Sequence, residues 1–198
     1  MYSYGRGNPP FCVMMNYQLI KTKRKTIAVS VRDGIVIVRA PLRTTRREAD
    51  AFVKKYEDWI SSQLEKDAAR RRETDAVPKL TQQEIADLYA RAKEAIPDRV
   101  RYYAERLGAD YGRVTIRCQR SRWGSCSAKR NLNFNCLLML APDEVIDAIV
   151  VHEVCHLKEM NHSARFYALV LSLYPDYHRW NQWLKDNGRL ILARVPRE

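Results

Sequence analysis

The sequence predicts an α+β protein: a β-hairpin, two long helices, and then a compact core of strands around a further helix. Three observations support this prediction. Apolar and polar residues alternate on both sides of Asp33-Gly34, capping patterns mark long amphipathic segments, and an apolar helical stretch leads into His152. With 46% hydrophobic and 29% charged residues, the 198-residue chain has the composition of a folded protein with a core, not of a disordered one.

The first elements are predicted to be paired strands over residues 17–40. β-Branched residues alternate with small or polar ones there, and Asp33-Gly34 is a dipeptide typical of a hairpin turn. A helix is expected over residues 46–72, because apolar residues recur on one helical face and Thr44 or Thr45 can cap its start.

The second long helix is expected to begin at Thr81, which forms a capping-box pattern with Glu84, and to end at Leu107-Gly108. Pro97 should start a new turn or a kink within it, because proline lacks a backbone donor. The second half of the chain is predicted to contain a strand at 114–117, a turn at Trp123-Gly124, a strand at 131–140, and helices at 141–156, 163–174 and 177–187, the last closed by Gly188.

Cysteine content and hydropathy bear on the compartment. The five cysteines are odd in number and contain no C-x-x-C pair, so we expect reduced thiols and a cytoplasmic protein. The longest uncharged stretches fall short of the roughly 18–20 apolar residues that span a bilayer. Residues 1–16 are interrupted by Asn8, Pro9 and Pro10, which predicts an irregular leader.

The residues at 152–156 form the pattern H-E-x-x-H. Residues four apart lie on one face of a helix, so His152 and His156 can reach one metal ion, with Glu153 beside them as general base toward a metal-activated water. A chance match on an amphipathic helix is the competing interpretation. Three of the four histidines in the chain fall between residues 152 and 162, at ligand spacing, which disfavours chance.

His162 is expected to be the third ligand. Six residues advance about 9 Å along a straight helix, whereas zinc–nitrogen bonds are about 2.0–2.1 Å long. The helix must therefore end before His162; Asn161 can end it and Ser163 can cap the next one. His178 and a downstream carboxylate remain the alternative third ligands, and Asn161, Glu159 or Ser163 could orient a ligand imidazole. Three imidazoles with an open position favour zinc, while nickel, cobalt or manganese stay open.

Two blocks of sequence carry a resemblance to a known family. The segment Ser121-Arg122-Trp123-Gly124-Ser125-Cys126-Ser127 comes first; H-E-x-x-H, Asn161-His162-Ser163 and Phe166 follow it. Together they resemble the YgjP-like metallohydrolases, zincins whose core is similar to SprT-like and WLM proteases. The resemblance implies a minimal zincin core in which His152, His156 and His162 hold zinc and Glu153 activates water. It also implies one domain over residues 17–198, with the hairpin and long helices in 17–112 and the metal-binding core in 113–198.

The same resemblance implies where substrate lies. Zincins lay a substrate along an edge strand beside the metal, which would place it near Asn131–Asn135 and make Asn133 a binding residue. The spacing from His152 to His162 also resembles that of metzincins, but Glu159 stands where their pattern has glycine.

The sequence leaves three functions open. The first is a zinc-dependent metallopeptidase. The second is a metal-dependent nucleoside triphosphate pyrophosphatase, which the resemblance implies because YgjP-like proteins have also been assigned nucleoside triphosphate hydrolysis. No acidic residue lies between Asp110 and Asp143, and Arg120 and Arg122 could hold phosphate there. The third is a DNA-associated zinc module without catalysis.

The net charge of +12 bears on partners. It predicts an anionic partner or a solvated basic face. A peptide or nucleotide substrate is expected, nucleic acid could bind without sequence specificity, and no membrane partner is expected.

Overall fold

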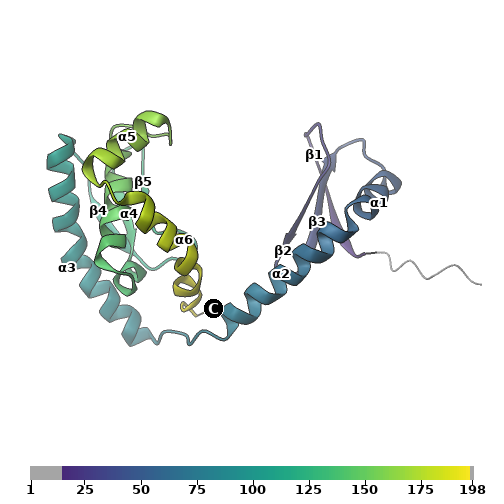
Figure 1. The fold of residues 1–198 in the computed structure, drawn as a ribbon, viewed down its shortest axis with the longest axis horizontal. Helices are drawn as coiled ribbons and strands as arrows, with labels where there is room; N and C mark the ends of the chain where they lie inside the picture. The colour runs from purple at the N-terminus through teal and green to yellow at the C-terminus, as the bar shows by residue number, and fades with distance from the viewer. Residues whose placement is uncertain (1–14, 197–198) are drawn as a thin grey trace, which may run out of the picture. The chain divides into compact units, whose positions relative to one another are not determined.

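The computed structural model describes residues 15–196, which form two compact units that divide between Glu73 and Thr74 (Figure 1). The division falls within the segment that the sequence assigns to one domain, and it differs from the expected boundary between residues 112 and 113. The leader predicted for residues 1–16 lies almost entirely outside the described residues.

The first unit contains a three-stranded sheet in the order β1-β3-β2. Its strands are β1 (Tyr17–Thr22), β2 (Ala28–Arg32) and β3 (Ile35–Pro41). Strands β2 and β3 form the predicted antiparallel hairpin, and Asp33 and Gly34 both have positive φ, as a tight hairpin turn requires. Strand β1 pairs with β3 in parallel, so the sheet is mixed.

Two helices, α1 (Arg46–Lys55) and α2 (Glu57–Asp75), follow the sheet. Of the two capping candidates, Thr44 and Thr45, it is Thr45 that caps α1, where it forms a capping box with Glu48. Val36 and Val38 of β3 are buried in one cluster with Ala49, Val53 and Ile60 of the helices. The sequence predicts a single helix here, but the chain bends at Tyr56, where neither glycine nor proline signals an interruption.

The second unit begins with the long helix α3 (Gln82–Leu107), capped by Thr81 and ended by Gly108 with φ of 62°, as predicted. The helix continues through Pro97 without interruption. Arg99 of α3 donates to the carboxylates of Asp143 and Asp147, at 2.9 and 2.8 Å, and so ties α3 to the helix that carries H-E-x-x-H.

A second three-stranded sheet, in the order β4-β6-β5, packs beside that helix. Its strands are β4 (Val114–Arg117), β5 (Gly124–Cys126) and β6 (Leu132–Asn135), and the 3-10 helix η1 (Cys136–Leu140) follows. The prediction of a turn at Trp123-Gly124 is wrong at Gly124, because this residue is the first of strand β5. The strand expected over residues 131–140 is correct only in its first half, because the Asn135 side chain accepts the Leu137 N–H and caps η1.

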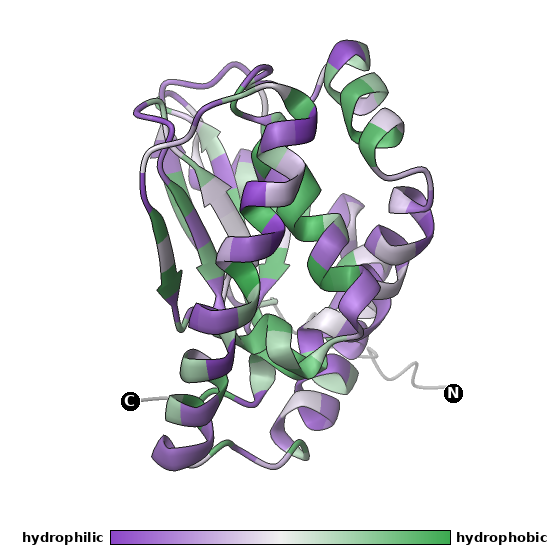
Figure 2. Ribbon diagram, turned by 90° about the vertical axis from the view of Figure 1, so that its left-hand side faces the viewer, coloured by the Kyte–Doolittle hydropathy of each residue, from purple (hydrophilic) through white to green (hydrophobic). Residues whose placement is uncertain are grey.

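Helices α4 (Asp143–Cys155), α5 (Ala164–Leu173) and α6 (Tyr177–Ala193) complete the second unit. Helix α4 is buried along most of its length, whereas the ribbons of other helices alternate between green and purple in Figure 2, as expected for amphipathic helices. The prediction that Gly188 ends the last helix is wrong, because α6 continues to Ala193. A Cβ at Gly188 would lie 3.0 Å from Trp123, so this glycine serves close packing. No described helix is long and apolar enough to cross a membrane.

Candidate metal centre

The three histidines expected as ligands come together at the end of α4. His152 lies in the last turn of α4, His156 is its C-cap, and His162 follows in the segment that leads to α5. The Nε2 atom of His152 is 3.2 Å from that of His156 and 3.0 Å from that of His162. The helix ends at Cys155, six residues before Asn161, so the expectation that Asn161 ends it is wrong, whereas Ser163 caps α5 as predicted.

Two of the three imidazole rings have a hydrogen-bond partner at Nδ1, the nitrogen that does not face the other histidines. The Nδ1 atom of His156 lies 2.9 Å from the backbone oxygen of Glu159, and a carbonyl only accepts, so this nitrogen carries the proton and Nε2 keeps its lone pair. The Nδ1 atom of His152 lies 2.8 Å from the Tyr177 hydroxyl. Of the orienting residues proposed from the sequence, only Glu159 acts on a ligand ring, and it does so through its backbone.

The arrangement fits one metal ion. Ligands with bonds of about 2.0–2.1 Å around a tetrahedral ion stand roughly 3.3 Å apart, close to the separations from His152. The ligand atoms of the three histidines all lie within 4.8 Å of one another. Burial, together with the neighbouring imidazoles, lowers the pKa of His152 to about 4, which keeps the ring neutral as a ligand must be. Nitrogen lone pairs that face one another at these distances repel unless a cation lies between them.

Glu153 is buried beside this cluster. Burial raises the pKa of its carboxyl to about 8. The backbone of Gly124 lies directly against the side chain: a Cβ at Gly124 would lie 2.6 Å from Glu153 Cγ and 2.7 Å from Oε1. Only glycine leaves room for the carboxylate here, so the sequence pair Trp123-Gly124 has a steric role that its pattern did not reveal.

Strand β5, which begins at Gly124, is an edge strand, because it pairs only with β6 in this sheet. Its other side leaves main-chain donors and acceptors available for another strand. The expectation that Asn131–Asn135 forms the edge is wrong, because β6 is the central strand. The edge beside the general-base candidate is therefore Gly124–Cys126.

The three residues expected to bind substrate lie on two different elements. Arg120 and Arg122 are exposed on the loop that joins β4 to β5 and leads directly into Gly124. Asn133 pairs with Ser125, donates to its hydroxyl at 3.2 Å, and accepts from Arg117. Since neighbouring strand residues point to opposite faces, Asn133 faces away from the side on which Gly124 meets Glu153.

Sequence reasoning missed two supporting residues. Asn135 is buried, and its amide donates to the backbone oxygens of Gln119 and Arg122 at 2.7 and 2.8 Å, which fixes the loop that carries the arginines. Tyr177 lies 25 residues from His152 and starts another helix. No local spacing rule links such pairs, although a buried asparagine at a strand end is a signal for backbone contacts.

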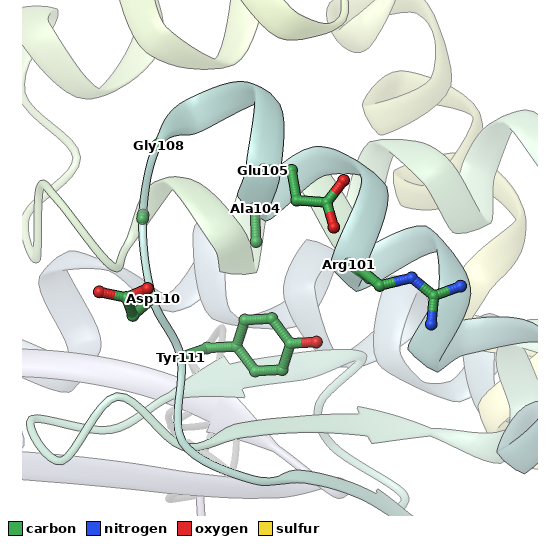
Figure 3. Close-up of a pocket in the computed structure, with 7 residues that line it drawn as sticks. Arg101, Ala104, Glu105, Gly108, Asp110 and Tyr111 are labelled. Carbon is green, nitrogen blue, oxygen red and sulfur yellow. The ribbon is translucent and has the colours of Figure 1, made fainter.

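His178, the alternative third ligand, contacts Tyr167 with ring centroids 6.3 Å apart and is outside the histidine cluster. A separate hollow of about 350 Å³ lies at the end of α3, where Glu105, Asp110 and Arg101 line it together with Tyr111 (Figure 3). It contains none of the residues predicted for the site.

A helix that carries H-E-x-x-H beside a mixed sheet, with a third histidine after the helix ends, is the arrangement expected of a zincin-type metal centre. Comparison with protein families agrees with this class. The model described as "YgjP-like, metallopeptidase domain" matches residues 67–187, and the chain belongs to this family. The resemblance stated from the two motif blocks is thereby confirmed.

Individual relatives cover parts of the chain. The UTP pyrophosphatase of Escherichia coli (strain K12) is 37% identical over 76 residues, which are 38% of this chain and 43% of that protein. The zymogen of abylysin from Pyrococcus abyssi, a metallopeptidase, is 21% identical, with a TM-score of 0.43 over 48% of this chain and 96% of its own. The jannalysin zymogen of Methanocaldococcus jannaschii is 19% identical, with a TM-score of 0.42 over 47% and 96%.

Proposed function

We propose that the protein is a zinc-dependent metallopeptidase with Glu153 as general base. The observation that carries this proposal is the contact between Glu153 and Gly124, the first residue of an edge strand. A peptide that adds to such an edge pairs through its main chain, as in other cases of β-strand addition. Its carbonyl groups would then run past the carboxylate of Glu153 and the histidine cluster.

His152, His156 and His162 would hold the metal. A bound zinc ion supplies Lewis-acid polarisation and makes water a nucleophile near neutral pH. Glu153 takes the proton from the attacking water at a carboxylate oxygen and then delivers it to the leaving nitrogen of the peptide bond. Burial raises the affinity of this carboxyl for the proton that it takes from water, while the positive charge of a bound metal ion would favour its ionised form before the attack.

A second candidate is a metal-dependent nucleoside triphosphate pyrophosphatase. The UTP pyrophosphatase relative favours it, as do Arg120 and Arg122 on the loop before Gly124. Guanidinium groups bind phosphate oxygens in bidentate fashion. In this case Asn135, which holds the loop, would set the position of the phosphate contacts.

The DNA-associated zinc module without catalysis is the weakest of the three. Structural zinc sites are closed by four protein ligands, whereas the cluster found among the described residues has three. A general-base candidate buried beside the cluster has no purpose in such a module. A cytoplasmic location stays a prediction; the free thiols of the four described cysteines support it.

Glu153→Gln tests the assignment of the base. We expect hydrolysis to fall by about 100-fold or more, while zinc content, measured by mass spectrometry, stays at one ion per chain. Glu144→Gln is the matched control, because Glu144 is an exposed carboxylate at the start of the same helix. Unchanged hydrolysis in Glu153→Gln would contradict the role of Glu153.

The substrate is tested by giving the zinc-loaded protein two panels side by side. One contains quenched fluorescent peptides of mixed sequence, and the other contains nucleoside triphosphates with pyrophosphate release as the readout. Peptide cleavage that disappears in Glu153→Gln supports the peptidase. Pyrophosphate release that disappears in the same variant, without peptide cleavage, supports the second candidate.

A further inference from the structure

Basic side chains gather at one end of the sheet in the first unit. Strands β1 and β3 run parallel and β2 runs against them, so the ends of β1 and β3 lie beside the start of β2 (Figure 1). The turn between β1 and β2 therefore shares this end of the sheet with the last residues of β3. We call the following residues the basic end: Lys21, Lys23, Arg24, Lys25, Arg39 and Arg43.

Acidic residues near the basic end are few and already engaged. Between residues 16 and 47 the sole acid is Asp33, which lies in the turn at the opposite end of the sheet and pairs with Arg71. In the following helix, Glu48 accepts the N–H and the hydroxyl of Thr45. Asp50 accepts from the Tyr17 hydroxyl and from Arg46. Among the described residues, no ion pair involves a side chain of the basic end.

The basic end continues onto the sheet face that the helices leave open. Arg39 lies in the central strand on this face, between Ile20 of β1 and Ala28 of β2. Its guanidinium donates to the Ser30 hydroxyl at 3.1 Å and remains exposed, so it is held on the surface of the sheet. Lysines on the adjoining turn extend the same surface with flexible, exposed charges.

We propose that the basic end binds the phosphate backbone of nucleic acid without base specificity. A row of cations on two strands and a turn can follow a polyanion, whose condensed counterions are released on binding. Residues 18–43 contain no aromatic side chain on which a base could stack, which favours backbone contacts over sequence readout. The large apolar side chains exposed near it, Ile20 and Leu42, are too few to insert into a lipid surface.

The test compares two triple variants of the full chain. Lys23→Gln, Lys25→Gln and Arg43→Gln together remove three exposed charges of the basic end. Lys54→Gln, Lys55→Gln and Lys66→Gln together remove the same charge from exposed positions on α1 and α2. The probe is a labelled single strand of about 20 nucleotides in mixed sequence, followed by fluorescence anisotropy from about 50 to about 200 mM salt.

The wild type should bind with a steep salt dependence that is the same for different base sequences. The first triple variant should lose about tenfold or more in affinity at low salt and reduce the salt slope by about two. The second should change affinity by less than about threefold, and both should hydrolyse substrate like the wild type, because none of these residues lies in the metal centre.

Three results would overturn the proposal. One is no binding by the wild type at low salt. Another is an equal loss in the two triple variants, which would mean that only total charge matters. The third is binding to anionic phospholipid vesicles, lost in the first triple variant, while the affinity for the oligonucleotide stays unchanged. Failure of the proposed hydrolase function would leave the oligonucleotide and vesicle binding readouts intact, so the two proposals fail separately.

Discussion

The close approach of Gly124 to Glu153 makes a sharp prediction at the scale of single residues. Gly124→Ala puts a methyl group within 3 Å of the carboxylate, so Glu153 must move. We expect hydrolysis to drop about tenfold or more, with zinc content unchanged because the atoms nearest to the added methyl group belong to Glu153. Ser125→Ala, on the next residue of β5, is the control. Wild-type turnover in Gly124→Ala would show that Glu153 has freedom to shift.

Tyr177 is expected to orient a metal ligand. Tyr177→Phe keeps the ring but removes the hydroxyl that lies 2.8 Å from His152 Nδ1. Loss of such an orienting hydrogen bond costs about 10–100-fold in metal affinity, which competition with a chelator measures. Tyr174→Phe removes a hydroxyl that donates instead to the backbone of Glu144 and should leave affinity unchanged. Equal metal affinities of the wild type and Tyr177→Phe would contradict the role of Tyr177 in orienting His152.

The choice of third ligand can be tested directly. His162→Ala should lower zinc affinity far more than His178→Ala, since only His162 belongs to the cluster. Mass spectrometry after dialysis against a weak chelator measures the retained zinc. Similar retention in the two variants would reject His162 as a ligand.

Among the elements, the loop from residue 118 to 123 depends on one buried side chain. Asn135→Asp replaces the amide donor by an oxygen that faces the backbone oxygens of Gln119 and Arg122. We expect the free energy of unfolding to fall by about 1–3 kcal/mol, measured by urea denaturation, and hydrolysis to fall as Gly124 loses its position.

Asn133→Asp is the matched substitution on the same strand. Its side chain faces the other side of the sheet, beside Arg117, and a carboxylate there keeps an acceptor for the guanidinium. Little change is expected in either measurement. A selective loss of turnover in Asn133→Asp, with stability intact, would favour the substrate-binding role expected for Asn133 from the sequence.

The elements also show what local sequence can predict. Thr45, Thr81 and Gly108 act through neighbours within a few residues, so their capping roles could be predicted. Gly188 could not, because the reason for this glycine is Trp123, which is distant in sequence. The order of the strands was likewise hidden, since the pairing that makes β6 central involves segments separated by loops.

The candidate site divides in the same way. The histidine pattern with its helix is a local signal, and the expected ligands do come together. Tyr177 and Asn135 support the site from distant positions in the chain, so a rule based on residue spacing could not predict their roles. The position of Glu153 next to His152 can be read from the sequence, but its burial is a property of the folded unit.

For the molecule as a whole, the two compact units should respond differently to metal. All expected ligands lie in the second unit. Zinc at about 100 times its dissociation constant should stabilise that unit by about 2.7 kcal/mol. Hydrogen exchange should therefore slow in peptides from α4 and α5 and stay unchanged in peptides from β1, β2 and β3. Equal protection of both units would mean that they unfold together.

The hydrogen bond from His156 to the backbone oxygen of Glu159 has a consequence for mutational tolerance. Every amino acid supplies a main-chain carbonyl, so the orientation of this ligand does not depend on which side chain stands at position 159. His152, in contrast, relies on a hydroxyl that a single nucleotide change can remove. Substitutions of the side chain at position 159 should thus leave the metal centre unchanged. Position 177, in contrast, should be constrained to residues whose side chain can accept a hydrogen bond from Nδ1 of His152.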